Sequence, residues 1–369
     1  MCLGPKHGNK VAAGGGNNDS AISSSRKIAY ATTSFVLGAW AFYKVNSISG
    51  PAFEPIVEAC TNPDYTSVEE FVSKSGYHAY EPMVGLKVFN FMVCLITQFL
   101  LELRQTYPAG MLTWLGVVLV GMPAGTLMTI EAGRAGGARG PIRYPIILGL
   151  LYQLFGISVM FPLLWVPSYV YGRGSGPISN YRVAATIPLN IPGILLTVAV
   201  FSLDTDSYLW TLCAGILGGP LIAMSPAVLW NDVPPPSTNK EIVQKSVTSV
   251  QHVFRFMTLV GVIGWYISLS IVYNSYSKME GPASSIAGNL WSDVWVKANA
   301  SVAFMTIDTG VLYVGVLLCI AFQDATKALR TIMLTPVMGP AAASWVLAEL
   351  EETRYEESSS LEKTKIKET

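Results

Sequence analysis

Apolar residues along the chain gather in long runs that are separated by shorter polar stretches. Each run is about 16 to 24 residues long, the length that an α-helix needs to cross a bilayer core. The pattern predicts an all-α, polytopic integral membrane bundle with eight or nine transmembrane helices. Eight spans are expected near 28–44, 83–101, 109–130, 144–167, 183–203, 209–230, 256–273 and 300–322. A ninth apolar segment, 331–348, is interrupted by prolines and leaves the count open.

The two ends of the chain differ from this apolar region. Residues 1–27 are polar and glycine-rich, which predicts a disordered tail before a transmembrane domain at 28–348. Residues 349–369 are strongly charged and predict a solvated tail. Arg26 and Lys27 precede the first run, but the long leader without a clear cleavage site favours a retained span over a signal peptide.

Composition agrees with a membrane protein, because 51% of the 369 residues are hydrophobic and only 13% are charged. Basic and acidic residues number 24 each, so nothing indicates a nucleic-acid partner. Cys94, Cys213 and Cys319 fall in apolar runs, where cysteine acts as a small hydrophobic residue. Cys2 and Cys60 show no spacing typical of a disulfide framework or a zinc site.

Lysine and arginine in the polar segments favour a cytoplasmic amino terminus, in the endoplasmic reticulum membrane. Counting crossings from there places Arg134, Arg139 and Arg143 on the lumenal side. Three arginines break the pattern there, which indicates a function near the membrane surface that retains them. The carboxyl tail is cytoplasmic if 331–348 does not cross the membrane, and lumenal if it does.

Asp308 is the deepest acid in any predicted span, and a charged group inside a span is costly enough to be a functional hypothesis. Apolar surroundings favour its protonated form, which is a proton donor. The alternative is that Asp308 hydrogen-bonds a neighbouring helix and takes no part in chemistry. Helical spacing places on its face Phe304, Met305, Leu312 and Gly315.

Glu131 ends the third predicted span, within the stretch TIEAGRAGGARGPIRYP at 129–145. Arg134 follows at the i, i+3 spacing, which permits a local ion pair of little energetic weight near a surface. The functional interpretation makes Glu131 a proton donor or the partner of one, with Arg134 tuning it. The glycines allow the backbone to fold over a site, or simply to turn.

The polar segment at 45–82 ends with His78, Tyr80 and Glu81 at the edge of the second predicted span. An amphiphilic substrate would enter the bundle at this height, so Tyr80 and Glu81 are candidate catalytic residues. The alternative is an interfacial belt of aromatic side chains. Candidate substrate-binding residues across the chain are Phe304, Met305, Tyr152, Gln153, Trp165 and His78.

Motifs of several large enzyme classes are absent from the sequence. It contains no DDxxD cluster to hold Mg²⁺ against a diphosphate, no Walker loop, no dinucleotide fingerprint and no HExxH. An enzyme built on this chain is therefore expected to use carboxylic acids, hydroxyl groups and aromatic faces, without a cofactor or a metal site.

Three stretches resemble the membrane-bound terpene cyclases of fungal meroterpenoid biosynthesis, of the ascofuranone and macrophorin type. They read YEPMVGLKVFNFMVCLITQFLLEL, TIEAGRAGGARGPIRYP and GLLYQLFGISVMFPLLWVPSYVYG. The resemblance covers most of residues 80–345, although none of the stretches is a short diagnostic signature. It implies a metal-independent cyclisation: an acid protonates a terminal epoxide or alkene of a farnesyl chain, rings close, and a base removes the last proton.

Such a reaction passes positive charge through carbon centres, so it requires aromatic faces and the exclusion of water. No residue role is carried over from the family. The catalytic candidates Glu131, Asp308 and Glu81 follow from the physical argument. Glu131 or Asp308 is the expected proton donor, Arg134 tunes or orients it, and Glu81 or Tyr80 assists at the mouth. The resemblance implies a small lipophilic prenylated substrate, membrane lipid and other enzymes of the same pathway as partners.

Two other functions stay open at the level of the sequence. A proton-coupled transporter or efflux protein for a lipophilic metabolite would use Asp308 and Glu131 as proton carriers, although neither an internal repeat nor clearly paired broken helices are evident. A membrane protein that binds a sterol or another lipid without catalysis is the remaining possibility.

Overall fold

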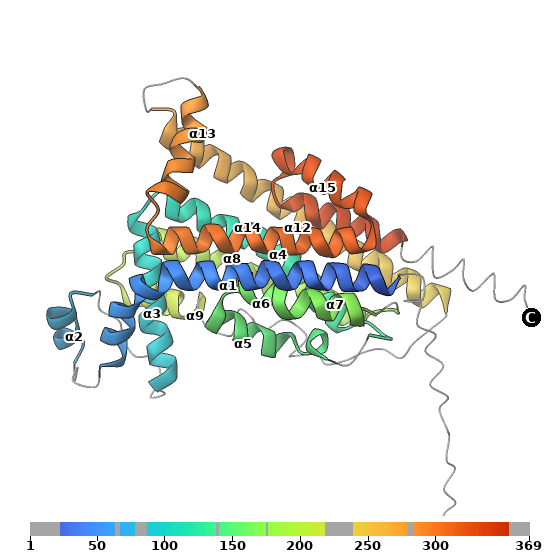
Figure 1. Ribbon diagram of the computed structural model, residues 1–369, viewed down its shortest axis with the longest axis horizontal. Helices are drawn as coiled ribbons and strands as arrows, with labels where there is room; N and C mark the ends of the chain where they lie inside the picture. Colours follow the sequence, from blue (N-terminus) through green and yellow to red (C-terminus); the bar gives the residue numbers. More distant parts are fainter. Residues whose placement is uncertain are drawn as a thin grey trace, which may run out of the picture.

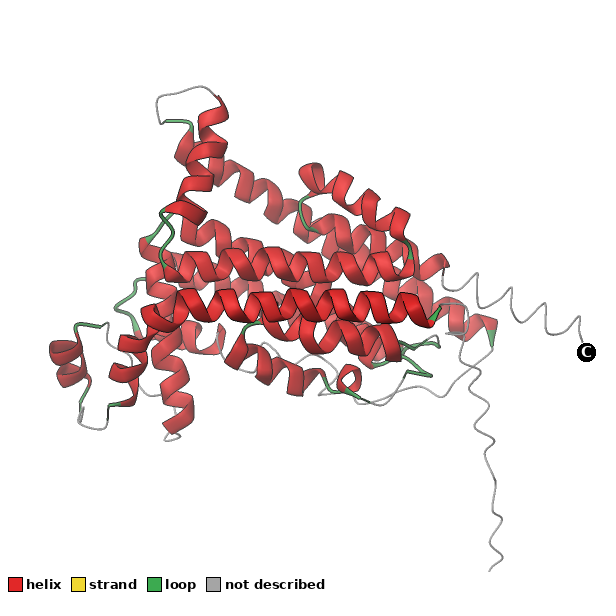
Figure 2. Ribbon diagram, viewed as in Figure 1, coloured by secondary structure: helices red, strands yellow, loops and turns green. Residues whose placement is uncertain are grey.

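The computed structural model describes residues 23–62, 67–77, 87–137, 140–174, 176–217, 239–278 and 283–353. Helices account for most of these residues, and no strand occurs among them (Figure 2). A last helix covers residues 341–353. The other elements are α1 (Ser24–Thr61), α2 (Val68–Ser75), α3 (Lys87–Gln105), α4 (Ala109–Ala132), η2 (Pro141–Arg143), α5 (Pro145–Phe155), α6 (Ile157–Met160), η3 (Phe161–Trp165), α7 (Val166–Gly172), α8 (Asn180–Ser202), α9 (Tyr208–Leu217), α12 (Lys240–Tyr276), α13 (Ala283–Trp291), η4 (Ser292–Val296), α14 (Ala300–Gln323) and α15 (Ala325–Met338).

Three of the described helices, α4, α12 and α14, are long and apolar enough to cross a membrane. Helices α4 and α14 run in the same direction. Near their starts Thr309 Oγ1 donates to Thr113 O at 3.4 Å, and near their ends Glu131 interacts electrostatically with Cys319. The all-helical architecture is confirmed, and these helices support a membrane protein. The predicted count of eight or nine spans is not confirmed.

The bundle has two ends that differ in chemistry. Helix α1 begins where α14 finishes, because Arg26 Nη2 and Tyr30 Oη both donate to Ala321 O at 3.1 Å. This end is called the arginine end. At the opposite end Cys60, in the last turn of α1, forms a disulfide with Cys94, and we call it the disulfide end. Helices α1 and α14 lie side by side between the two ends (Figure 1).

Helix α3 lies wholly at the disulfide end. Cys94 in its first half is bonded to Cys60, and Glu102 in its last turn accepts a hydrogen bond from Ser301 Oγ at 2.5 Å, at the start of α14. Figure 1 shows α3 running across the bundle rather than along it. The prediction of a span at 83–101 is therefore wrong as a passage from one end to the other.

The segment predicted as a single span at 144–167 is a helical hairpin. Helix α5 enters from the arginine end and stops at Gly156, whose φ of +87° is a conformation that glycine adopts at little cost. The helical segment Ile157–Gly172, made of α6, η3 and α7, then returns. We call residues 145–172 the first hairpin.

Backbone hydrogen bonds show that the first hairpin begins and ends at the arginine end. Ala135 N donates to Pro177 O at 2.9 Å, and Gly176 N donates to Ala135 O at 3.0 Å. The chain that leaves α4 therefore pairs with the chain that leaves α7. The prediction that 144–167 crosses the bundle is wrong, since the segment returns to the end from which it came.

A second hairpin, residues 325–353, follows α14. Helix α15 runs back from the arginine end to Gly339, whose φ of +62° permits another reversal, and the helix at 341–353 returns. The two arms are antiparallel, because Lys327 Nζ donates to Thr353 Oγ1 at 2.8 Å.

A second contact also joins the two arms, since Arg330 Nη1 donates to Glu349 Oε2 at 2.7 Å. The apolar segment 331–348 is thus split between two arms and does not cross. Residue 349, expected to begin the solvated tail, lies within the returning helix, which extends to Thr353.

The arginine-rich stretch lies at the end of the bundle opposite to the one that the sequence predicted. Glu131 and Arg134 lie at the same end as the start of α1, whereas the sequence predicted the opposite side. The error arose because α3 was counted as a crossing. With that crossing removed, Arg134 and Arg143 lie at the end of the bundle where α1 begins.

Candidate functional site

Arg134 connects two acids that are far apart in the sequence. Its Nε donates to Glu131 Oε1 at 2.9 Å, and its Nη1 and Nη2 donate to the two carboxylate oxygens of Glu351 at 2.9 and 2.5 Å. A bidentate guanidinium–carboxylate pair is among the strongest charge-assisted contacts in proteins. Arg134 therefore joins the end of α4 to the returning arm of the second hairpin.

This network is buried, whereas the sequence predicted an ion pair near the surface. The exposed fraction is 1% for Glu131, 2% for Arg134 and 4% for Glu351. A buried ion pair is costly to break, because the remaining charge loses its partner without regaining water. The i, i+3 pair is confirmed, but its expected position near the surface is wrong.

Arg182, near the start of α8, adds a second buried guanidinium to this region. A β-carbon on Gly133 would lie 2.3 Å from its Cδ, so Gly133 provides the space that the arginine side chain occupies. Two acids and two arginines thus gather at the arginine end. This balance of charge is typical of a network that holds helices together.

The apolar side of Glu131 faces the first hairpin and α14. Its carboxylate lies near the Cys319 thiol of α14, and the same thiol lies near Tyr152 of α5. Tyr152 Oη donates to Met128 Sδ at 3.3 Å. Tyr152 is therefore a neighbour of the Glu131 network, where its hydroxyl is held by a sulfur atom of α4.

Asp308 occupies a second site, at the tip of the first hairpin. It is 3% exposed, and its Oδ1 accepts a hydrogen bond from Ser158 N at 3.3 Å. Ser158 lies in the first turn of the helical segment Ile157–Gly172, where backbone N–H groups carry a partial positive charge. The expectation that Asp308 contacts a neighbouring helix is confirmed, and the contact identifies Ser158 as its partner.

Three side chains, including that of Asp308, lie close to one point beside Gly156. A β-carbon on Gly156 would contact Phe304 Cζ at 3.5 Å, Asp308 Oδ1 at 3.6 Å and Ser158 Oγ at 3.8 Å. These are ordinary van der Waals distances, so a carbon atom fits there. An acid, a hydroxyl group and an aromatic ring edge thus surround a single position.

Asp308 and Glu131 do not share a site. Cys319, the neighbour of Glu131, follows Asp308 by 11 residues along α14. At 1.5 Å per residue this separation corresponds to about 16 Å along the helix axis. The two acids can therefore not act together on one reacting atom.

The apolar packing of α14 also changes at Asp308. On the arginine-end side Leu312 and Val316 belong to the largest cluster of buried residues. On the other side Val302 and Met305 belong to a cluster with α3 and α9. Asp308 lies between the two, at a position where the core contains an acid.

The aromatic candidates divide between these regions. Phe304 packs edge-to-face against Phe99 of α3, with ring centroids 5.7 Å apart, close to Asp308. Trp165 is fully buried between Phe161 and Tyr169, in a stacked row that leads toward the arginine end. Phe304 is thus the described aromatic candidate that lies beside the acid, and Trp165 is a packing residue.

Several predicted residues lie outside the described part of the chain. They are His78, Tyr80, Glu81 and the side chain of Gln153. Among the described residues, no group of three or more histidine, cysteine, aspartate or glutamate side chains is placed to hold a metal ion.

Sequence reasoning missed four residues that shape these sites. Cys60 and Cys94 form a disulfide although their separation of 34 matches no framework spacing, and Cys94 had been interpreted as a small hydrophobic residue. Glu351 was assigned to the solvated tail. Ser158 gave no signal of its own, but Gly156 before it, within an apolar run, was a possible sign of a break.

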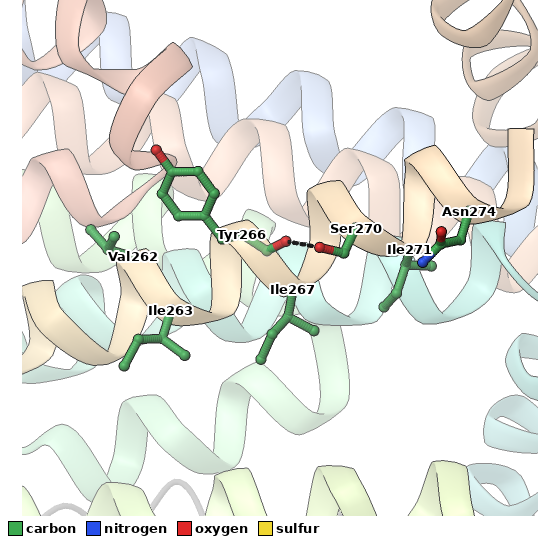
Figure 3. Close-up of a pocket in the computed structure, with 7 residues that line it drawn as sticks. All are labelled: Val262, Ile263, Tyr266, Ile267, Ser270, Ile271 and Asn274. Carbon is green, nitrogen blue, oxygen red and sulfur yellow. Dashed lines mark hydrogen bonds between the residues drawn. The ribbon is translucent and has the colours of Figure 1, made fainter. Parts of the chain in front are cut away.

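A groove lies on the outward face of α12, away from both acids. It has a volume of about 470 Å³ and is open to the surroundings. Figure 3 shows the side chains that line it, all from α12. Ser270 Oγ donates to Tyr266 O within the same helix at 2.9 Å. The groove contains no titratable acid, so it is not a candidate for proton chemistry. Its lining residues are Val262, Ile263, Tyr266, Ile267, Ser270, Ile271 and Asn274.

Comparisons with known proteins give no match. No protein-family model fits the chain, no curated protein is significantly similar to it in sequence, and no solved structure is significantly similar to it in fold. Function is therefore argued from the two acidic sites themselves.

Proposed function

We propose that the protein is an integral-membrane terpene cyclase that starts a metal-independent cyclisation of a farnesyl-type chain by protonating it. The observation that carries the proposal is Asp308, a buried carboxyl group within the bundle that accepts a hydrogen bond from an uncharged donor, Ser158 N. Phe304 lies beside it. The resemblance of residues 80–345 to fungal meroterpenoid cyclases supports the same function.

The chemistry requires one proton to enter and one to leave. The O–H bond of protonated Asp308 breaks as the proton moves to the terminal alkene carbon or epoxide oxygen. The electron pair of the next double bond then closes the ring at the resulting cationic carbon. A base takes the last proton, so the product is an isomer of the substrate. Phe304 lies beside the site of proton transfer with its Cζ edge toward the point beside Gly156, where it supplies apolar contact and helps to exclude water.

Glu131 is the weaker of the two proton-donor candidates. Its salt bridge with Arg134 requires the ionised carboxylate, which has no proton to give. The network in which it lies connects α4 with the second hairpin. Its role in this proposal is to hold the arginine end together, with Arg134 as the central residue.

The cyclase is proposed to lie in the endoplasmic reticulum membrane with the arginine end in the cytoplasm. Positive residues favour the cytoplasmic side, and disulfides persist in the oxidising lumen. The disulfide end and the arginine end are opposite ends of the bundle, so both criteria agree. Described arginines at the arginine end include Arg26, Arg134, Arg143, Arg173 and Arg182.

A labelling experiment tests this orientation. In sealed microsomes, a membrane-impermeant thiol reagent added outside should leave Cys60 and Cys94 unmodified, even after mild reduction with an impermeant phosphine. Labelling of both should require reduction together with permeabilisation. Labelling in sealed vesicles after impermeant reduction would place the disulfide end in the cytoplasm and contradict the orientation.

Turnover tests the reaction class. Microsomes that contain the protein are incubated with a farnesyl-phenol, with and without a terminal epoxide. The expected product has the mass of its substrate, a new retention time and ring carbons in its NMR spectrum. Unchanged substrate from both compounds, with folded protein present, would contradict cyclisation of this substrate class.

A proton-coupled transporter is the second candidate, and the two hairpins favour it. Helices that enter a bundle and reverse within it are typical of transporter binding sites. No clearly paired broken helices were predicted from the sequence. In the structure, both hairpins enter from the arginine end. Under this function Asp308 carries a proton, and an imposed pH gradient drives uptake of chemically unchanged metabolite into proteoliposomes. Such uptake without any cyclised product would select the transporter.

A further inference from the structure

Ser158 is placed to act on Asp308 by two different groups. Its backbone N–H already donates to Asp308 Oδ1 at 3.3 Å. Its hydroxyl oxygen is fully buried and has no hydrogen-bond partner within the described part of the chain. A buried hydroxyl without a partner loses its hydrogen bond to water and gains nothing in return. Such a group inside a functional site requires an explanation.

The geometry at Gly156 brings the hydroxyl and the carboxyl group together. Asp308 Oδ1 and Ser158 Oγ lie 3.6 and 3.8 Å from the same point, where a β-carbon of Gly156 would be. The left-handed conformation of Gly156 sets the direction in which the chain enters the following helix. Ser158 therefore faces Asp308 because the hairpin reverses two residues earlier.

We propose that Ser158 is a positioning residue for Asp308, and that its hydroxyl and backbone N–H together receive the carboxylate that remains after proton donation. The inference rests on the proposed function. When Asp308 loses its proton, negative charge appears on the two oxygens of a side chain that is almost fully buried. Two aligned donors on one serine stabilise that charge, and the partial positive charge of the helix start adds to it.

The same arrangement defines where the reacting end of the substrate lies. A carbon at the point beside Gly156 is in contact with the acid oxygen and with the edge of the Phe304 ring. In the proposed function, this carbon belongs to the terminal alkene or epoxide of the substrate. The remaining prenyl units extend away from Ser158.

Replacement of Ser158 separates this role from simple packing. Ser158→Ala is expected to lower kcat about 10- to 100-fold and to leave KM unchanged, because a hydrogen bond to a charged group is lost only after the proton has moved. Ser158→Thr restores the hydroxyl and should recover most of the rate. A KM that rises while kcat is unchanged would overturn the inference.

Ser344 supplies a matched control in the second hairpin. It lies in the returning helix after Gly339, is fully buried, and also has a hydroxyl without a partner among the described residues. It belongs to the second hairpin, and not to the first hairpin or to α14, which carry Ser158 and Asp308. Ser344→Ala should leave kcat within about twofold of the unmodified protein, by the additivity of distant sites.

An infrared spectrum of the ionised carboxylate gives a readout that does not depend on turnover. The carboxylate band that is lost in Asp308→Asn should shift in Ser158→Ala, since the Ser158 hydroxyl is proposed to donate to the ionised form. Ser344→Ala should leave the band unmoved. An unmoved band in Ser158→Ala contradicts this inference alone. A shifted band with no cyclised product contradicts the proposed function while the contact between Ser158 and Asp308 stands.

Discussion

Two buried acids, Glu131 and Asp308, occupy opposite situations within one bundle. Glu131 is bound to a guanidinium in a network that includes a second acid and a nearby arginine. Asp308 is bound to a backbone N–H at the tip of a hairpin, beside an aromatic ring and an uncharged hydroxyl. Both acids are almost inaccessible, so burial alone does not separate them.

The partner of each acid determines what it can do. A carboxylate paired with arginine is held in its ionised form and contributes to the connection between helices. A carboxyl group whose neighbours are neutral can take up and release a proton. We conclude that burial of an acid in a membrane bundle indicates chemistry only when its partners are uncharged.

The largest expected effect follows from removing the proton of Asp308. Asp308→Asn keeps the size of the side chain and the ability to accept from Ser158 N, but it removes the acid. Turnover is expected to fall by about 10²- to 10⁴-fold, the usual contribution of a general acid. Product formation in microsomes measures it.

The control for this variant is Asp324→Asn. Asp324 caps α15 with hydrogen bonds from Thr326 N and Lys327 N, and asparagine caps a helix equally well. Its turnover should be unchanged. Full activity in Asp308→Asn would remove Asp308 as the proton donor.

Loss of the central arginine tests the structural side of the comparison. Arg134→Met leaves Glu131 and Glu351 buried without their shared partner, which is expected to cost about 3 to 5 kcal/mol of stability. Thermal unfolding in detergent measures the change. The outcome that contradicts it is a variant as stable as the unmodified protein.

An exposed ion pair provides the matched comparison. Arg330 and Glu349 form a salt bridge with side chains that are 51% and 28% exposed. Arg330→Met should therefore cost less than about 1 kcal/mol. Equal losses in the two arginine variants would show that burial of the Glu131 network has no energetic consequence.

A methyl group placed at the point beside Gly156 should lower turnover by an intermediate amount. Gly156→Ala places a methyl group where the substrate carbon is proposed to lie, so turnover is expected to fall about 10-fold or more. The left-handed conformation adds a stability cost of about 1 to 2 kcal/mol.

Gly76 shares the positive φ but has open space around it. Gly76→Ala should show a similar loss of stability with turnover unchanged, as measured by unfolding and product formation. A loss of turnover in both variants would mean that backbone strain, rather than occupied space, is responsible.

The smallest effect on turnover is expected at Glu131. Glu131→Gln keeps an acceptor for Arg134 Nε and removes one charge from the network. Turnover should stay within a few-fold of the unmodified protein, whereas stability should fall by about 1 to 3 kcal/mol. A loss of turnover as large as that of Asp308→Asn would make Glu131 the donor and reverse the comparison.

The sequence predicted the class of fold better than the path of the chain. Apolar runs identified helices correctly, because the hydropathy and the length of a run indicate whether a helix can lie in a membrane or in a protein core. Neither property indicates the direction of a helix, so the segments at 83–101 and 144–167 were taken as crossings and 331–348 was left open. The turns at Gly156 and Gly339 depend on backbone conformation and on tertiary contacts that no periodicity reveals.

The candidate site was predicted in part for a similar reason. Asp308 and Glu131 were found because acids are rare in apolar runs. Two contacts of these sites were missed, since Ser158 is 150 residues from Asp308 and Glu351 is 217 residues from Arg134 along the chain. Pairing of Cys60 with Cys94 likewise depends on α3 lying against the end of α1. Long-range contacts of this kind decide which acid is free to carry a proton.

The most direct test of the account is the infrared carboxyl band of the purified protein, compared between Asp308→Asn and Glu131→Gln. The account predicts a protonated-carboxyl band that disappears in Asp308→Asn and persists in Glu131→Gln. A band that persists in Asp308→Asn and disappears in Glu131→Gln would show that the proton belongs to Glu131, and would contradict the account.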